Sequence, residues 1–276
     1  MEVSLSQTSI RLAFDEVGLL HRLPSARSIT LDCPDLKPPN DLSDEGRRLA
    51  LQAWGDRTRS EYSGVMIVRH FHGLLVDLNS PMDLQELALA MVLQEQQHAR
   101  LCMEAVKSLG GSPELTFELD QLQMQRSDAP LEFQFFQSLV GTYAIGEAVA
   151  LDLLVGSLSA LPNTGYRDIL KRIARDEVLH GRIGMQILEQ IRANQNTPWI
   201  RWPGDELIAS MAKSQIDYMQ TRDLVEPEEI MAFNQPELAK ELQQLGIPDS
   251  REFRQIYDES LETGLPSAFA KMGIKL

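Results

Sequence analysis

The chain has 276 residues and a formal net charge of −14, and 43% of its residues are hydrophobic and 24% charged, as in ordinary globular proteins. The length fits one large domain or one domain with an appendage, and the acidic balance argues against nucleic-acid and anionic-membrane binding, which need a basic face. The absence of a run of about 18 apolar residues predicts no transmembrane helix, and the two cysteines, Cys33 and Cys102, favour a cytoplasmic protein with reduced thiols over a disulfide scaffold.

Residues 1–43 contain prolines at four positions, which prevent a long helix there. We therefore predict an irregular N-terminal arm that packs on the main body. Its first residues, MEVSLSQTSIRLAFDEV, lack the basic start and continuous apolar core of a secretory signal, so we expect none.

Residues 44–194 contain four long apolar patterns with few helix breakers. Helix-capping and acidic residues in the segment 41–45 begin the first pattern, and Gly110-Gly111 ends the second. We expect helices over about 44–78, 82–109, 131–160 and 166–193.

The lengths of the connections predict how these helices are arranged. Turns of a few residues join the first to the second helix and the third to the fourth, which makes each pair an antiparallel hairpin. The connection over about 111–130 spans up to about 66 Å, more than the roughly 42 Å of a 28-residue helix. The expected fold is all-α: a four-helix bundle with one long crossover between helices 2 and 3.

Residues 195–276 are predicted to form a helical C-terminal extension, with helices near 205–221, 236–244 and 250–262. The sequence leaves two roles open for it, namely covering the bundle or forming an oligomer contact.

Two Glu-x-x-His motifs lie in the middle of the second and fourth expected helices. Glu95 precedes His98, and Glu177 precedes His180, by three residues, so that each carboxylate and imidazole project from the same helix face. A further glutamate lies one helix earlier in each half: Glu61 is 34 residues before Glu95, and Glu147 is 30 residues before Glu177. In a helical hairpin, these spacings bring each early glutamate to the level of its motif. Four carboxylates and two imidazoles are the ligands of a carboxylate-bridged dinuclear iron or manganese site.

The surroundings of Glu147 strengthen this interpretation. The residue lies in an almost wholly apolar run, Tyr143 to Leu151, where a buried charge costs several kcal/mol unless it is paired or bound to a metal. A buried network of Glu–His hydrogen bonds without metal is the alternative.

On these six residues, the segment 44–194 resembles the ferritin-like di-metal carboxylate superfamily. The resemblance implies that Glu61 and Glu147 are terminal ligands, that Glu95 and Glu177 bridge two metal ions, and that His98 and His180 bind one ion each. It implies two iron ions, with manganese or a mixed pair as alternatives, because the ligand set suits both metals. It also implies a homodimer.

Other residues have more than one interpretation. Asp176, next to Glu177, is either a hydrogen-bond partner of His98 or a solvated surface residue, and its counterpart in the first half is Gln94. Tyr143, one turn before Glu147, is either a hydrogen-bond donor or redox residue near the metals, or a core tyrosine.

The function expected from the resemblance is that of a non-haem di-iron oxygenase or oxidase. Such an enzyme activates O2 in order to hydroxylate, desaturate, cleave or N-oxygenate a small organic substrate. Peroxide chemistry, iron oxidation or storage, and a metal-free scaffold are the alternatives. The sequence identifies neither the substrate nor the electron donor.

Overall fold

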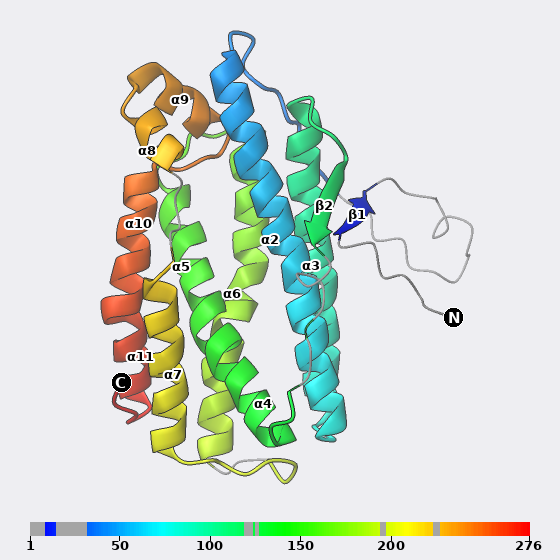
Figure 1. The fold of residues 1–276 in the computed structure, drawn as a ribbon, viewed down its shortest axis with the longest axis vertical. Coiled ribbons are helices and arrows are strands. Elements are labelled where there is room, and N and C mark those ends of the chain that lie inside the picture. Colours follow the sequence, from blue (N-terminus) through cyan, green and yellow to red (C-terminus); the bar gives the residue numbers. More distant parts are fainter. Residues whose placement is uncertain (1–8, 15–31, 119–123, 125–126, 194–196, 223–226) are drawn as a thin grey trace, which may run out of the picture.

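The computed structural model describes residues 9–14, 32–118, 124, 127–193, 197–222 and 227–276, and it is mostly helical. The long helices lie side by side along the longest axis of the molecule (Figure 1). The all-helical character predicted from the sequence is therefore confirmed, apart from one pair of short strands.

The first hairpin consists of α2 (Asp44–Asp77) and α3 (Met82–Ser108). The hydroxyl of Ser43 accepts a hydrogen bond from the backbone N–H of Gly46 at 3.0 Å, which satisfies one of the free donors at the start of α2. Asn79 takes a positive φ of 52° in the turn after α2, and Gly110 takes one of 85° after α3. These local signals place the helix boundaries within one or two residues of the predicted ones.

The second hairpin differs from the prediction in one respect. The stretch 131–158 is helical throughout, but it consists of α4 (Leu131–Ser138), the π-helical segment η2 (Leu139–Gly146) and α5 (Glu147–Leu158). An uninterrupted α-helix over 131–160 was expected. Because η2 itself is almost wholly apolar, its side-chain pattern does not reveal where the helix turn widens. The helix α6 (Gly165–Arg192) follows, with the Thr164 hydroxyl accepting from the backbone N–H of Arg167.

A small sheet corrects the expectation of a wholly irregular arm. The strand β1 (Ser9–Ala13) lies in the arm and pairs antiparallel with β2 (Glu114–Glu118), with Ser9 opposite Glu118. In β2, Leu115 and Phe117 are buried and the residues between them are exposed, which is the alternation of a strand with one covered face. Residues 1–8 and 15–31 of the predicted arm lie outside the described residues.

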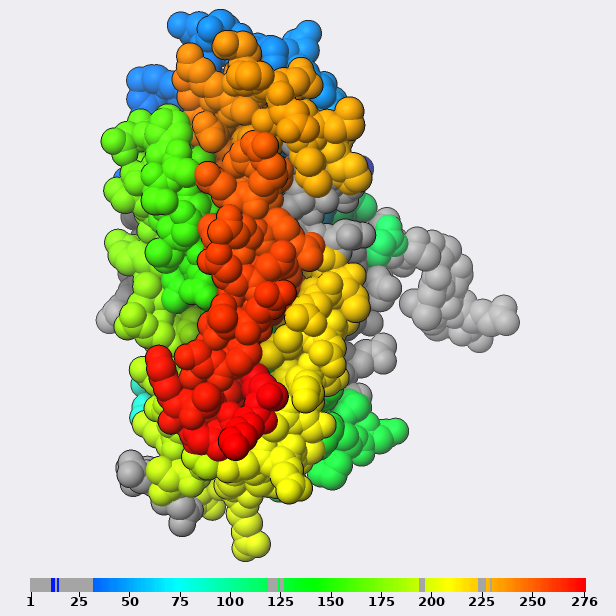
Figure 2. Space-filling model, turned by 90° about the vertical axis from the view of Figure 1, so that its left-hand side faces the viewer, coloured from blue at the N-terminus to red at the C-terminus, as the bar shows by residue number. Residues whose placement is uncertain are grey.

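The C-terminal extension packs on the long helices. It comprises α7 (Asp205–Gln220), α8 (Pro227–Phe233), α9 (Pro236–Gln244), α10 (Ser250–Glu259), the π-helical segment η3 (Ser260–Gly264) and α11 (Leu265–Lys271). Figure 2 shows α10 and α11 running down the molecule between α5 and α7. The sequence did not predict α8, a single short piece whose neighbouring residues 223–226 are not described. Of the two roles left open by the sequence, the structure shows the covering one.

The core consists of two apolar clusters. One combines the stretch 135–149 with side chains of α7, α10 and α11, and the other combines the first half of α2, the second half of α3 and the first half of α6. The stretch Leu131–Leu158 is the one described helix that is long and apolar enough to cross a membrane by length and composition. It carries Glu147 and packs against α6, α7 and α10.

Candidate metal centre

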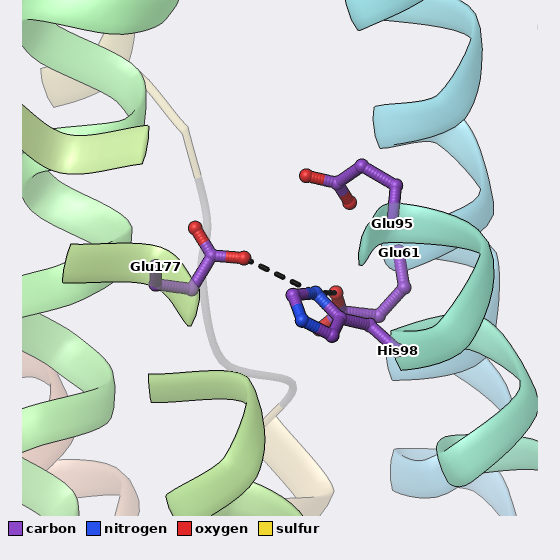
Figure 3. Close-up of side chains that lie close together, drawn as sticks. All are labelled: Glu61, Glu95, His98 and Glu177. Atoms are coloured by element: carbon purple, nitrogen blue, oxygen red, sulfur yellow. Dashed lines mark ion pairs between the residues drawn. The ribbon is translucent and has the colours of Figure 1, made fainter. Parts of the chain in front are cut away.

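Four helices contribute side chains to one buried polar cluster. Glu61 comes from α2, Glu95 and His98 from α3, Glu147 from α5, and Glu177 and His180 from α6. Their ligand atoms form two groups in which all atoms lie within 4.8 Å of one another: Glu61, Glu95, His98 and Glu177, and Glu95, Glu147 and His180. The two groups share Glu95. In Figure 3, Glu61, Glu95 and His98 point from α2 and α3 towards Glu177 on α6.

The cluster lies where the two apolar clusters meet. On α3, the motif lies between Met91 of the first apolar cluster and Cys102 of the second. On α6, the motif likewise lies between Ile183 of the first cluster and Ile173 of the second. Glu95, His98, Glu177 and His180 are at most 4% exposed. Charged groups are therefore held in a region from which water is largely excluded, and this is costly without a partner of opposite charge.

In the first half of the cluster, the ring of His98 lies between two sets of carboxylates. Its Nδ1 atom is 3.3 Å from an oxygen of Glu61 and 3.3 Å from one of Glu177. On its other side, Nε2 lies 3.3 Å from the carboxylate of Asp176. This confirms that Asp176 is the partner of His98 and not a free surface residue. Since an ionised carboxylate only accepts, Nε2 is the donor, and Nδ1 faces the centre.

The second half is arranged in the same way around His180, but a different residue contacts the outer ring nitrogen. The Nδ1 atom of His180 lies 3.0 Å from an oxygen of Glu95 and 3.2 Å from one of Glu177, while its Nε2 lies 3.0 Å from the side-chain oxygen of Gln94. The sequence identified Gln94 as the counterpart of Asp176, but not as the partner of His180. The two oxygens of Glu177 face different histidines, as a bridging carboxylate requires.

The donor atoms that face the centre fit a metal ion. Among the described residues, the buried atoms His98 Nδ1, His180 Nδ1 and Glu177 Oε2 have no hydrogen-bond partner, although Glu177 oxygens lie 3.3 Å from His98 Nδ1 and 3.2 Å from His180 Nδ1. A buried polar atom without a partner costs about 1–3 kcal/mol. Imidazole nitrogens and carboxylate oxygens are the usual ligands of iron and manganese, so a metal ion in each group would satisfy these atoms.

The electrostatics of the metal-free cluster show how strongly its groups interact. Burial alone would lower the pKa of His98, but the neighbouring carboxylates, first Asp176 and then Glu177 and Glu61, raise it to about 12. At His180, burial again lowers the pKa, but Glu177 and Glu95 outweigh burial and raise the pKa to about 10. Protons therefore occupy positions at the imidazoles that a cation would otherwise take.

The carboxyl groups respond in opposite directions. Burial would raise the pKa of Glu177, but the two histidines outweigh burial and lower it to about 2. Burial raises the pKa of Glu147 well above its usual range, and the negative charges of Glu177 and Glu95 add to this. Burial also raises the pKa of Glu95, so Glu147 and Glu95 both favour the protonated form more than Glu177 does.

Gly64 makes room for the shared ligand. A Cβ atom at this position, one turn after Glu61 on α2, would collide with the carboxylate of Glu95. Gly184 lets α6 approach η2 closely, because a Cβ atom at this position would collide with the backbone of Tyr143 and Ala144. Both glycines therefore leave space beside the ligands that a larger side chain would fill.

A pocket of about 270 Å³ reaches the outer edge of the first half. It is mostly polar and is lined by Asp32, Gln97, His98, Leu101, Arg172, Arg175 and Asp176. Arg172 pairs with Asp32 of the arm at 2.8 Å, and Arg175 lies 3.3 Å from Asp176. Asp176 therefore connects this pocket to the ring of His98.

Several other polar or reactive side chains lie outside the two ligand groups. His70 and His72 belong to neither. Cys102 is fully buried in the apolar core, as expected of a small hydrophobic residue. Tyr143 is also fully buried, and the negative charges of Glu147 and Glu95 help burial to raise the pKa of its phenol.

No known family model matches this chain, and no curated protein matches it in sequence. What is shown is therefore a mostly helical protein with a buried Glu/His cluster that could hold metal ions.

Proposed function

We propose that the protein is a ferritin-like non-haem di-iron enzyme that uses O2 to oxidise a small organic substrate. One observation carries the proposal: two overlapping groups of carboxylates and imidazoles share Glu95 and lie buried among four helices. Such twofold sets of Glu and Glu-x-x-His residues, projecting inward from a helical bundle, hold two metal ions in ferritin-like proteins.

In this proposal, each half of the cluster holds one ion. Glu61 and His98 would bind the first ion, Glu147 and His180 the second, and the carboxylates of Glu95 and Glu177 would bridge them. The contacts of Glu177 with both histidines, and the membership of Glu95 in both groups, support this division.

The bound metal pair would supply the redox chemistry with O2, and the protein would bind, orient and enclose the reactants. The ring nitrogens of His98 and His180 that face away from the centre are fixed by Asp176 and Gln94, which orient the imidazoles. The apolar clusters on both sides keep water from the centre and so limit side reactions. We expect a cytoplasmic homodimer and an electron donor of unknown identity.

The same ligands would also serve peroxide breakdown or iron oxidation and storage, so the test must separate these classes. Metal content is measured first, on protein from cells supplied with iron and manganese and on protein loaded anaerobically with ferrous ions. O2 uptake is then recorded with and without a panel of small organic substrates. About two iron ions per chain and substrate-dependent O2 uptake would support the proposal.

Each contrary result points to a different conclusion. Release of O2 from peroxide would favour catalase chemistry, and large shells with many iron ions per chain would favour storage. Failure to bind any metal, even under anaerobic loading, would overturn the proposal and leave a scaffold with a polar core.

A further inference from the structure

A buried tyrosine lies beside the second half of the metal centre. Tyr143 belongs to η2 and precedes Glu147 by four residues, so the two side chains project from the same side of the helix. Its ring is fully buried and packs against Phe71 of α2, with 4.4 Å between the ring centroids. Its neighbours thus fix the ring between α2 and the helix that carries Glu147.

The hydroxyl group of Tyr143 has no hydrogen-bond partner among the described residues. This is unusual, because buried tyrosine hydroxyls normally find one, and two other buried tyrosines of this chain do. Tyr257 donates to the backbone oxygen of Met219, and Tyr166 pairs with Ser108, each at 2.8 Å. Within the described part of the chain, Tyr143 therefore carries a buried donor without an acceptor.

The charges around the phenol indicate where that acceptor would be. Burial raises the pKa of Tyr143 well above its usual range, and the negative charges of Glu147 and Glu95 raise it further. Both glutamates belong to the group completed by His180. The phenol, four residues before Glu147 and on the same side of the helix, thus lies beside the ligands of the second metal position.

On the basis of the metal centre proposed above, we propose that Tyr143 donates a hydrogen bond to a small external ligand, an anion or an oxygen donor, that completes the Glu95–Glu147–His180 position. Four protein ligands at most reach this position, when Glu177 is included, and six-coordinate sites are common for metals bound by oxygen ligands. Tyr143 is then a ligand-contacting residue of the centre. Its hydrogen bond would favour anions at this position, despite the three carboxylates of Glu95, Glu147 and Glu177.

The test uses azide as the probe and Tyr143→Phe as the variant, in full-length protein loaded with iron. The substitution removes only the hydroxyl group. Metal content is measured first, and azide binding is then followed by calorimetry and by the visible absorption of the iron-loaded protein. We expect unchanged metal content and azide binding weaker by about tenfold, the effect of losing one hydrogen bond to a charged group.

Tyr257→Phe is the matched control, because it removes a buried hydroxyl that is already satisfied and lies in α10, away from the cluster. It should leave azide affinity unchanged and destabilise the metal-free protein. Tyr143→Phe should not destabilise the metal-free protein, since it removes a donor without an acceptor there.

The outcomes separate this inference from the proposed function. Equal azide affinity in the wild type and in Tyr143→Phe would overturn the inference and leave the metal centre intact. Loss of metal from Tyr143→Phe would also overturn it, because the hydroxyl would then support Glu147 itself. A wild-type protein that binds no metal would overturn both.

Discussion

The two halves of the cluster repeat the same ligands in different surroundings. His98 is held by a carboxylate, Asp176, which also touches Arg175 and borders a pocket open to solvent. His180 is held by a neutral amide, Gln94, and lies on the side of Tyr143 and the larger apolar cluster. A carboxylate partner makes an imidazole a stronger metal ligand than an amide partner does. Two positions with equal ligand sets are therefore expected to bind metal with unequal affinity.

The largest effect is expected from removing Glu95, the ligand that both halves share. Glu95→Ala deletes a ligand from both groups and should abolish metal binding at both positions, while the far-ultraviolet circular dichroism remains helical. Metal content per chain is the measurement. Glu104→Ala is the control, since Glu104 lies on the same helix, pairs with Lys107 and belongs to neither group. Two bound ions in Glu95→Ala would contradict the site assignment.

The next prediction tests whether the two positions differ in metal affinity. Asp176→Asn keeps the shape of the partner of His98 but removes its charge, and should weaken metal binding by roughly 10–100-fold at the first position. Gln94→Glu makes the reverse change beside His180 and should strengthen the second position. Both affinities follow from competition with a chelator. Equal affinities in all three proteins would mean that these partners do not distinguish the halves.

A smaller effect concerns the space beside Glu95. Gly64→Ala places a methyl group against its carboxylate and should weaken metal binding while destabilising the metal-free protein by about 1–3 kcal/mol. Gly55→Ala, on the same helix, meets its nearest atom only at 3.8 Å and should stabilise the protein by about 0.5–1 kcal/mol, because alanine favours helices. Chemical denaturation measures both. The same change in stability for the two variants would contradict the contact with Glu95.

The last effect is the pH dependence of the metal-free protein. The pKa values of His98, about 12, and His180, about 10, lie above the 6.5 of an unfolded histidine. Their contribution to the free energy of unfolding is complete below pH 6.5 and is lost as the pH rises through about 10 and 12. The denaturation midpoint should therefore fall between pH 7 and pH 9, while metal affinity rises, because binding displaces protons. A midpoint that rises over this range would be contrary to the geometry.

Local signals explain why much of the fold could be predicted. Ser43 and Thr164 cap α2 and α6, and Gly110 ends α3, so short-range chemistry alone marks these boundaries. The six candidate ligands came from spacing along the helices, and the structure brings all six into two groups that share one residue. Their role as ligands remains a prediction.

What could not be predicted depends on tertiary context. The pairing of β1 with β2 joins segments about 100 residues apart, and no short-range pattern reports such a partner. The π-helical turn before Glu147 lies in a run that is apolar on every side. The contact of Gln94 with His180 crosses from α3 to α6, and only the comparison with Asp176 hinted at it.

The small sheet links the N-terminal arm to the least buried part of the first half. Phe117 of β2 packs on Tyr62, whose neighbour in sequence is Glu61, with 5.5 Å between the ring centroids. If proteolysis removed the chain up to Phe14, the backbone of β2 would become an unpaired edge, open to pairing with another molecule. Shortened forms of this protein should therefore aggregate more readily than the intact chain, even though every candidate ligand would still be present.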